Sequence, residues 1–188
     1  KAGFHNFFIS TYYKAQKIQE HFGNGSDWGV KIEYINEDTP LGTAGAIGIL
    51  PKNLPKLPIL MMNGDVLSMV NFENLLAFHQ AQDGIATMCI REYEVQIPYG
   101  VVNIDKKQAK SIIEKPLQKF FVNAGIYVLE PEIVHKVSPN ASVNMPNLLE
   151  QQINEGETVS IYPIHEYWLD VGQMEEFKRA NKEIRFIE

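Results

Sequence analysis

Short apolar runs alternate with amphipathic stretches and turns through the first half of the chain. Four of these runs predict strands, at residues 7–9, 30–35, 59–63 and 85–90, and the first is expected to be buried. Helices are expected between the strands, at residues 14–22, 44–50 and 71–82. Asn71 is a good N-cap for the last of these helices. Repeated strand–helix alternation of this kind predicts an α/β domain with a largely parallel sheet.

The pattern changes near residue 98, where strands follow one another with little helix between them. These strands are predicted at residues 101–104, 111–114 and 121–129, and they favour mixed or antiparallel pairing. Pro131 and Pro146 each open a helix, because proline is favoured in the first turn. A strand at 159–162 and a helix from 173 to about 184 are expected to close the fold. We expect one α/β domain over residues 1–188, with a Rossmann-like open mixed, mostly parallel sheet and helices on both faces.

Composition narrows the class of protein. Of the 188 residues, 45% are hydrophobic and 21% charged, which is typical of a globular domain. The net charge is −6 and no basic tract occurs, so no nucleic-acid partner is expected. No apolar run reaches the ~18 residues of a membrane helix, so no membrane partner is expected either. Cys89 has no second cysteine to pair with, which makes a reducing cytoplasm the simplest location.

Two aspartates follow apolar runs and are candidates for a metal site. Asp65 ends Asn63-Gly64-Asp65 after the predicted strand 59–63, and Asp170 lies between Leu169 and Val171. Asp65 either caps the next loop or binds a metal, and Asp170 either caps the closing helix or binds one. If both bind, oxygen ligands without clustered His or Cys favour Mg²⁺ over Zn²⁺.

Further candidates are polar or glycine residues at element ends. In Leu41-Gly42-Thr43, Gly42 allows close approach to a flat ligand and Thr43 begins a helix; the alternative is an ordinary loop and cap. Gly100 marks a close approach or a plain turn. At Glu114-Lys115-Pro116 the proline ends the strand, so the acid and the base either converge on a ligand or form a solvated pair. Asn123 interrupts an apolar strand and needs a polar partner.

Five stretches place glycine or polar residues beside apolar runs, in this order: Pro40-Leu41-Gly42-Thr43-Ala44-Gly45, Asn63-Gly64-Asp65, Tyr99-Gly100-Val101-Val102, Glu114-Lys115-Pro116 with Val122-Asn123-Ala124-Gly125, and Trp168-Leu169-Asp170-Val171-Gly172. Together they resemble the sugar-phosphate nucleotidyltransferases, also called nucleoside-diphosphate-sugar pyrophosphorylases. The resemblance implies a nucleotide-diphospho-sugar transferase fold. It also implies transfer of a nucleotidyl group from a nucleoside triphosphate to a sugar 1-phosphate. The sequences at Met145–Leu149 and Glu166–Asp170 resemble the mannose-1-phosphate guanylyltransferase-like branch of this family.

The resemblance also assigns roles. It implies that Leu41, Gly42 and Thr43 line the base pocket with Gly64 near the nucleoside, inside a nucleotide-binding part at residues 1–98. It implies a sugar-binding part at 99–188, in which Gly100, Glu114 and Asn123 bind the sugar. Lys115 would meet the sugar phosphate, and Asp65 and Asp170 would hold Mg²⁺. Asp65, Lys115 and Asp170 are thus the implied catalytic residues.

One departure from the family pattern concerns its N-terminal signature. The Gly-rich loop with an essential Arg, and the Lys downstream of it, do not occur in this sequence. We therefore expect that about 50 residues of a typical domain are missing and that residues 1–188 alone are inactive. The strands at 7–9 and 59–63 are then expected to flank an open gap.

Other functions remain open from the sequence. One is a catalytically silent sugar-nucleotide-binding or regulatory subunit on the same fold. A metal-dependent glycosyltransferase is disfavoured, because no Asp-x-Asp occurs in the chain. The sequence does not decide whether the protein forms a homo-oligomer. It also does not identify the nucleoside base or the sugar of the substrates.

Overall fold

The computed structural model describes residues 2–172 and 174–183. The chain forms two compact units that interleave in sequence. Unit 1 contains the residues up to Gly64, Asn71–Met88 and Ile126–Ser160, and unit 2 contains Asp65–Val70, Cys89–Gly125 and the residues from Ile161 onward. Three strands each contribute residues to both units, and residue 98 lies within unit 2. The division into a nucleotide-binding part at residues 1–98 and a sugar-binding part at 99–188 stays a prediction.

Unit 1 holds most of the helices. Its elements are β1 (Asn6–Thr11), α1 (Ala15–Phe22), η1 (Ser26–Trp28), β2 (Lys31–Asn36), α2 (Gly42–Gly45), η2 (Ala46–Ile49), β3 (Ile59–Met62), α3 (Phe72–Gln80), η3 (Pro131–Lys136) and α4 (Met145–Asn154). Asn71 caps α3 as predicted, since its side chain accepts a hydrogen bond from Asn74 N. The helix predicted at Pro131 is a 3-10 helix.

Unit 2 is dominated by strands. Its own elements are β4 (Val66–Ser68), β6 (Val101–Asp105), β7 (Gln108–Ile113), β10 (Trp168–Asp170) and α5 (Met174–Glu183). Three further strands have residues in both units: β5 (Ala86–Gln96), β8 (Leu117–Leu129) and β9 (Val159–Pro163). The ends predicted for the closing helix, residues 173 and 184, lie outside the described residues.

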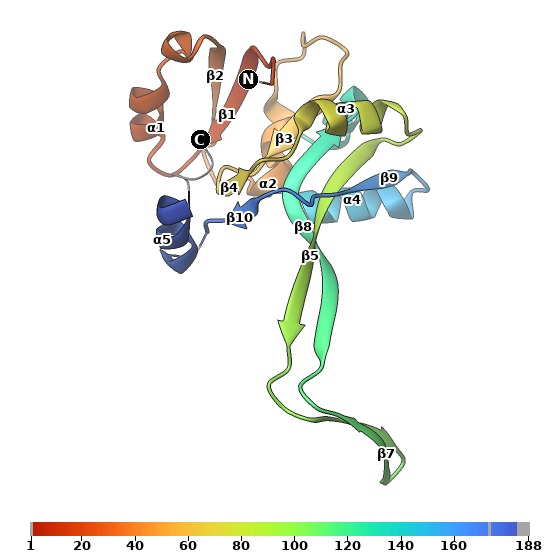
Figure 1. Ribbon diagram of the computed structural model, residues 1–188. Coiled ribbons are helices and arrows are strands. Elements are labelled where there is room, and N and C mark those ends of the chain that lie inside the picture. The colour runs from red at the N-terminus through yellow and green to blue at the C-terminus, as the bar shows by residue number, and fades with distance from the viewer. Residues whose placement is uncertain (1, 173, 184–188) are drawn as a thin grey trace. The chain divides into compact units, whose positions relative to one another are not determined.

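The strand pairing is mixed, with both parallel and antiparallel pairs. Figure 1 shows β1 and β2 side by side. β1 and β2 pair in parallel, from Asn6 opposite Lys31 to Thr11 opposite Asn36. β3 is the end strand of the sheet β3-β8-β5-β9 and pairs antiparallel to β8, not in parallel as its unbroken apolar run suggests. Uninterrupted apolar strands only indicate burial on both faces, and that does not fix strand direction.

β1 and β3 each have one paired edge. Among the described strands, β1 pairs with β2 alone and β3 with β8 alone, so each has one edge without a paired strand. β1 is less buried than predicted, because Phe7 is 41% exposed. That these two strands flank an open gap stays a prediction.

The apolar core of unit 1 forms where α4 packs on the sheet. Its buried members come from α2, η2, β5, β8, η3 and α4, and include Tyr127, Leu129 and Ile133. On α4 the inward face carries Met145, Leu148 and Leu149, with the spacing of one helical stripe.

Gln152 continues this apolar stripe as a buried amide. Its side chain is fully buried, and neither amide atom has a hydrogen-bond partner within the described residues. Hydrogen bonds from Gln151 and Lys136 are the main causes that lower the pKa of the nearby Glu155, and Gln152 is the weakest of them, which places its amide near this carboxylate without a hydrogen bond of normal geometry.

Replacing Gln152 by Met is therefore expected to stabilise the protein by about 1–2 kcal/mol, because an unpaired buried amide costs about that much. Chemical denaturation measures the change. The exposed neighbour Gln151 provides the control, and Gln151→Met should stay within about 0.5 kcal/mol of the wild type. A destabilised Gln152→Met protein would show that the amide is satisfied.

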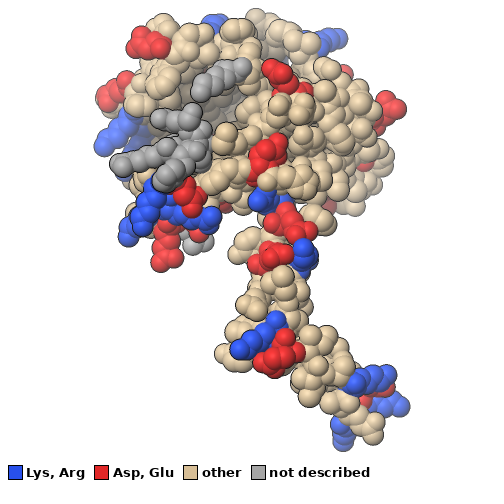
Figure 2. Space-filling view, in the orientation of Figure 1, with Lys and Arg blue, Asp and Glu red and all other residues tan. Residues whose placement is uncertain are grey.

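The β6–β7 hairpin of unit 2 is exposed throughout β7. Lysine side chains gather at its tip, as Figure 2 shows, and Lys110 pairs there with Asp105 at 2.9 Å.

No helix within residues 2–172 and 174–183 combines the length and apolarity needed to cross a bilayer.

Candidate functional site

Two three-residue strands bring Asp65 and Asp170 together. β4 and β10 pair antiparallel, with Val66 opposite Asp170, and they lie side by side in Figure 1. Asp65 directly precedes β4, and its carbonyl accepts a hydrogen bond from Val171 N at 2.8 Å. The two aspartates, far apart in sequence, are therefore cross-strand neighbours.

Alternation along β10 explains why the Asp170 carboxylate is accessible. Leu169 is 6% exposed and faces the interior, while Asp170 is exposed, as expected when successive side chains point to opposite faces. One oxygen of Asp170 accepts a hydrogen bond from Gly172 N at 2.9 Å. This bond to the next turn orients the carboxylate, and α5 begins only later, at Met174.

Gly172 keeps the space between the two carboxylates open. A Cβ on Gly172 would lie 3.1 Å from Asp170 Oδ1 and 3.5 Å from Asp65 Oδ2. Both oxygens thus surround one small volume that a side chain would fill. Two neighbouring carboxylates repel each other unless a cation lies between them.

The residue types at this place fit magnesium. Mg²⁺ in proteins is commonly held by one or two carboxylates together with substrate phosphates and water. The described residues contain no group of three or more His, Cys, Asp or Glu that could hold a metal. Two exposed carboxylates around an open volume match the magnesium pattern rather than a closed protein cage.

The predicted base-pocket loop is bound tightly to another segment of unit 1. Leu41 is 2% exposed, and its carbonyl accepts a hydrogen bond from Val143 N at 2.8 Å. Thr43 Oγ1 accepts one from Met145 N at 2.8 Å, so the Thr43 hydroxyl caps the start of α4. Thr43 N donates in turn to Asn144 Oδ1 at 3.3 Å. These side chains stabilise the loop itself.

Three glycines of this loop allow its backbone to approach residues 137–144. A Cβ on Gly42 would lie 2.7 Å from both Asn144 Oδ1 and Val143 O. Gly45 and Gly48 would meet other carbonyl oxygens of that segment at 2.5 and 2.7 Å. The close approach predicted for Gly42 is therefore made, at least on this side, by the protein's own backbone.

Glu37 is a supporting residue that the sequence did not single out. One carboxylate oxygen accepts a hydrogen bond from Leu41 N at 2.8 Å, and the other accepts one from Ser10 Oγ at 2.5 Å. Glu37 thus joins β1 to the start of the loop. A lone half-buried acid between strand and loop has no periodicity or motif that would have revealed it.

The predicted sugar-binding residues all lie in unit 2. Glu114 Oε2 lies 3.0 Å from the position that a Cβ on Gly100 would take, so Gly100 makes room for this carboxylate. Glu114 and Lys115 occupy the turn between β7 and β8, and Lys115 has a φ of 45°. β7 ends at Ile113, so the strand stops before the predicted Pro116, and the left-handed conformation of Lys115 turns the chain between the two strands.

Asn123 lies in β8, and the next residue in this strand, Ala124, is buried. Its Oδ1 accepts a hydrogen bond from Gly125 N at 3.0 Å, which orients the amide. The carbonyl of the intervening Ala124 accepts a hydrogen bond from Trp168 Nε1 at 2.8 Å. Trp168 opens β10, so this indole ties the strand of Asn123 to the strand of Asp170.

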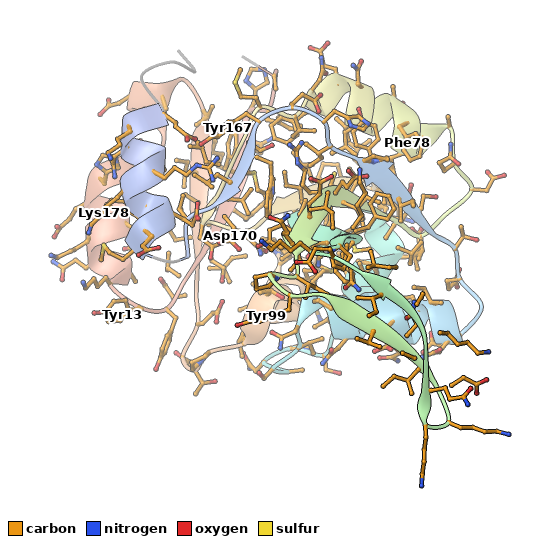
Figure 3. All side chains as sticks on the ribbon, turned by 60° about the horizontal axis from the view of Figure 1, so that its bottom comes forward. Tyr13, Phe78, Tyr99, Tyr167, Asp170 and Lys178 are labelled. Atoms are coloured by element: carbon orange, nitrogen blue, oxygen red, sulfur yellow. The ribbon has the colours of Figure 1, made fainter. Side chains whose placement is uncertain are left out.

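A second contact anchors the residue before β10. The Tyr167 hydroxyl donates to Glu183 on α5 at 2.7 Å, and Figure 3 labels both Tyr167 and Asp170. Burial, followed by this hydrogen bond, raises the pKa of Tyr167 to about 12. The strand that carries Asp170 is thus fixed at its start by a neutral phenol.

The predicted residues divide between the units. Leu41, Gly42, Thr43 and Gly64 belong to unit 1, whereas Asp65, Asp170 and the sugar-binding candidates belong to unit 2. Gly64 and Asp65 are consecutive, so the boundary runs through the Asn63-Gly64-Asp65 stretch.

A family model described as "Nucleotidyl transferase" matches residues 1–186. A mannose-1-phosphate guanylyltransferase from Mycobacterium tuberculosis is 28% identical over 190 residues, covering 97% of this chain and 52% of the relative. A mannose-1-phosphate guanyltransferase from Pichia angusta is 33% identical over 162 residues, covering 80% of this chain and 43% of the relative. The chain spans about half the length of these curated relatives.

Solved structures show the same fold. HddC from Yersinia pseudotuberculosis matches with a TM-score of 0.72 at 22% identity, covering 97% of this chain and 80% of that chain. A putative glucose-1-phosphate thymidylyltransferase from Bacillus anthracis, solved with a sucrose, matches with a TM-score of 0.72 at 19% identity, covering 96% and 76%. These matches confirm the predicted nucleotide-diphospho-sugar transferase fold.

Proposed function

The chain belongs to the nucleotidyl transferase family, and from that premise we propose that it forms the catalytic domain of a sugar-1-phosphate nucleotidyltransferase. The substrates are a nucleoside triphosphate and a sugar 1-phosphate, and the products are a nucleoside-diphosphate sugar and pyrophosphate. The observation that supports this most is the convergence of Asp65 and Asp170 around the volume that Gly172 leaves open.

In the proposed reaction, an oxygen of the sugar phosphate attacks the α-phosphorus of the triphosphate. A new P–O bond forms as the bond to the β-phosphate oxygen breaks, and pyrophosphate leaves with that electron pair. Little covalent chemistry is required of the protein, so positioning and charge neutralisation supply the rate. Asp65 and Asp170 would hold Mg²⁺, and the bound ion would supply positive charge to neutralise the phosphates.

The remaining candidates would bind and orient the two substrates. We assign the base pocket to Leu41, Gly42 and Thr43, with Gly64 near the nucleoside; the bonds from Glu37 and residues 143–145 pre-organise this loop. Gly100, Glu114 and Asn123 would bind the sugar. Lys115, held in a sharp turn, would meet the sugar phosphate as a point charge.

We further propose mannose 1-phosphate and GTP as substrates. The two curated relatives described above carry the names of mannose-1-phosphate guanylyltransferases. Their identities of 28% and 33% support the reaction class more strongly than the choice of base and sugar.

The lone cysteine takes no part in this chemistry. Cys89 is fully buried, and burial together with the charge of Glu166 raises the pKa of its thiol to about 12. A protonated, inaccessible thiol is a poor nucleophile. We propose a reducing cytoplasm as the place of action, because such a compartment is the usual setting for proteins without disulfides.

Pyrophosphate release tests the proposed function directly. The active protein is incubated with each nucleoside triphosphate and a panel of hexose 1-phosphates, with Mg²⁺ and without it. We expect release only when both substrates and the metal are present. A silent subunit would bind nucleotide without turnover, and a glycosyltransferase would instead consume a nucleoside-diphosphate sugar.

The Glu114→Gln variant should separate sugar use from nucleotide use. We expect the KM for the sugar 1-phosphate to rise about tenfold or more, because a charged acceptor of sugar hydroxyls is worth about 1.5–3 kcal/mol. Nucleotide affinity, measured by calorimetry, should change less than twofold. Asp105→Asn, on the neighbouring hairpin, is the matched control and should change neither. Equal loss of both affinities in Glu114→Gln would contradict the assignment.

A further inference from the structure

Trp168 links two strands of unit 2 by a single side-chain hydrogen bond. Its indole Nε1 donates to the Ala124 carbonyl at 2.8 Å. The indole is half-buried, and Ala124 is fully buried. A hydrogen bond to the carbonyl of a fully buried residue is costly to lose, because water does not readily replace the lost donor there.

On the metal side, the indole belongs to the strand that positions both carboxylates. Trp168 pairs with Ser68 at the start of β10, and Asp170 follows two residues later. Residues two apart in a strand point to the same face, so the indole and the Asp170 carboxylate share one face of β10. The backbone after Asp170 also binds Asp65 through the Val171 N–H. A shift of Trp168 therefore moves the surroundings of both carboxylates.

On the sugar side, the accepting carbonyl lies next to Asn123. Ala124 lies in the sequence between Asn123 and Gly125, and Gly125 N donates a hydrogen bond to Asn123 Oδ1. Gly125 has a φ of 68°, so the strand bends here. The indole thus fastens the bend that orients the Asn123 amide.

We propose that Trp168 is a positioning residue that couples metal binding at Asp65 and Asp170 to sugar-phosphate binding at Asn123. The proposal rests on the proposed function for the identity of the two ligands. Each ligand favours the arrangement of β8 and β10 in which the indole bond is made, so binding of one strengthens binding of the other. Thermodynamic linkage requires the two enhancements to be equal.

The test measures this coupling in the full chain, with Mn²⁺ and mannose 1-phosphate as probes. Free Mn²⁺ is followed by electron paramagnetic resonance, with and without saturating mannose 1-phosphate. Trp168→Phe keeps an aromatic ring and removes the donor. Trp28→Phe is the matched control, because Trp28 is 58% exposed, lies in unit 1 and packs on Phe22.

The wild type and Trp28→Phe are expected to bind Mn²⁺ at least about fivefold more tightly when mannose 1-phosphate is present, within the usual range of such coupling. In Trp168→Phe this factor should fall below twofold, while each ligand alone still binds. If Trp168→Phe weakens both ligands but keeps the wild-type factor, its role is structural and the proposal is wrong. A wild type that binds neither probe overturns the proposed function as well.

A second measurement covers the case in which Trp168→Phe does not fold. In Trp28→Phe protein, Trp168 is the remaining tryptophan, because the chain has two. Its emission should shift when mannose 1-phosphate is added, and the shift should grow when Mn²⁺ is also present. Asn123→Ala should abolish the response to the sugar. An unchanged emission spectrum with both ligands bound would refute the coupling.

Discussion

Replacing Asp65 or Asp170 by Asn is expected to lower kcat about a thousandfold in the active protein and to leave its fold intact. Each substitution removes one of the two carboxylates that surround the volume at Gly172. Metal stabilisation of transferring phosphate is worth several kcal/mol, and each 1.36 kcal/mol is a tenfold change in rate. Both side chains are exposed, so the amides should be tolerated structurally.

The controls for this prediction separate catalysis from stability. Asp83→Asn, at an exposed position of unit 1, should leave kcat unchanged. The double variant Asp65→Asn/Asp170→Asn should be little slower than either single variant, because residues that act as a unit are not additive. Multiplied losses in the double variant would indicate that the two carboxylates act at separate sites.

Replacing Gly42 by Ala is expected to destabilise the protein by about 3 kcal/mol or more. Gly42 has a φ of 74°, a conformation that costs an L-residue roughly 1–2 kcal/mol. The new Cβ would also lie 2.7 Å from Val143 O, and overpacking of this kind adds about 1–3 kcal/mol. Denaturant titration of the variant against the wild type measures the loss.

Gly29 offers the matched control for this effect. Its φ is 71°, almost the same, but a Cβ there would meet nothing within 4 Å. Gly29→Ala should therefore cost only the backbone term of about 1–2 kcal/mol. The difference between the two variants reports the close packing of the loop on residue 143. If Gly42→Ala keeps wild-type stability and loses only nucleotide affinity, Gly42 serves the ligand rather than the fold.

The sequence predicted the longer elements well, because their signals are local. The Asn71 cap, Pro146 in the first turn of α4 and the apolar run of β3 each identify an element without reference to the rest of the chain. Strand direction was not predicted in this way. β3 pairs antiparallel to β8, and that choice depends on connections distant in the sequence.

β4 and β10 were not predicted as strands, although the aspartates beside them were. Each is three residues long, and neither has a local pattern strong enough to define a strand. They form because they pair with each other. The proximity of Asp65 and Asp170 was expected from the motifs and the family resemblance, whereas the strand pair that produces it came from the structure.

The glycine loop shows a different limit of sequence reasoning. A glycine that permits close approach gives the same signal whether a ligand or the protein's own backbone is the neighbour. At Gly42, Gly45 and Gly48 the neighbour is the segment at residues 137–144. Glu37, which fixes the same loop, was missed because an isolated acid in a loop usually faces solvent.

The most direct test of the account is to locate Mn²⁺ bound to the active protein by anomalous scattering, in crystals grown with a nucleoside-diphosphate sugar. The account predicts a peak between the carboxylates of Asp65 and Asp170, at metal–oxygen distances of about 2.1 Å, in contact with a phosphate oxygen of the ligand. A Mn²⁺ peak bound to phosphate but held by neither aspartate would contradict it.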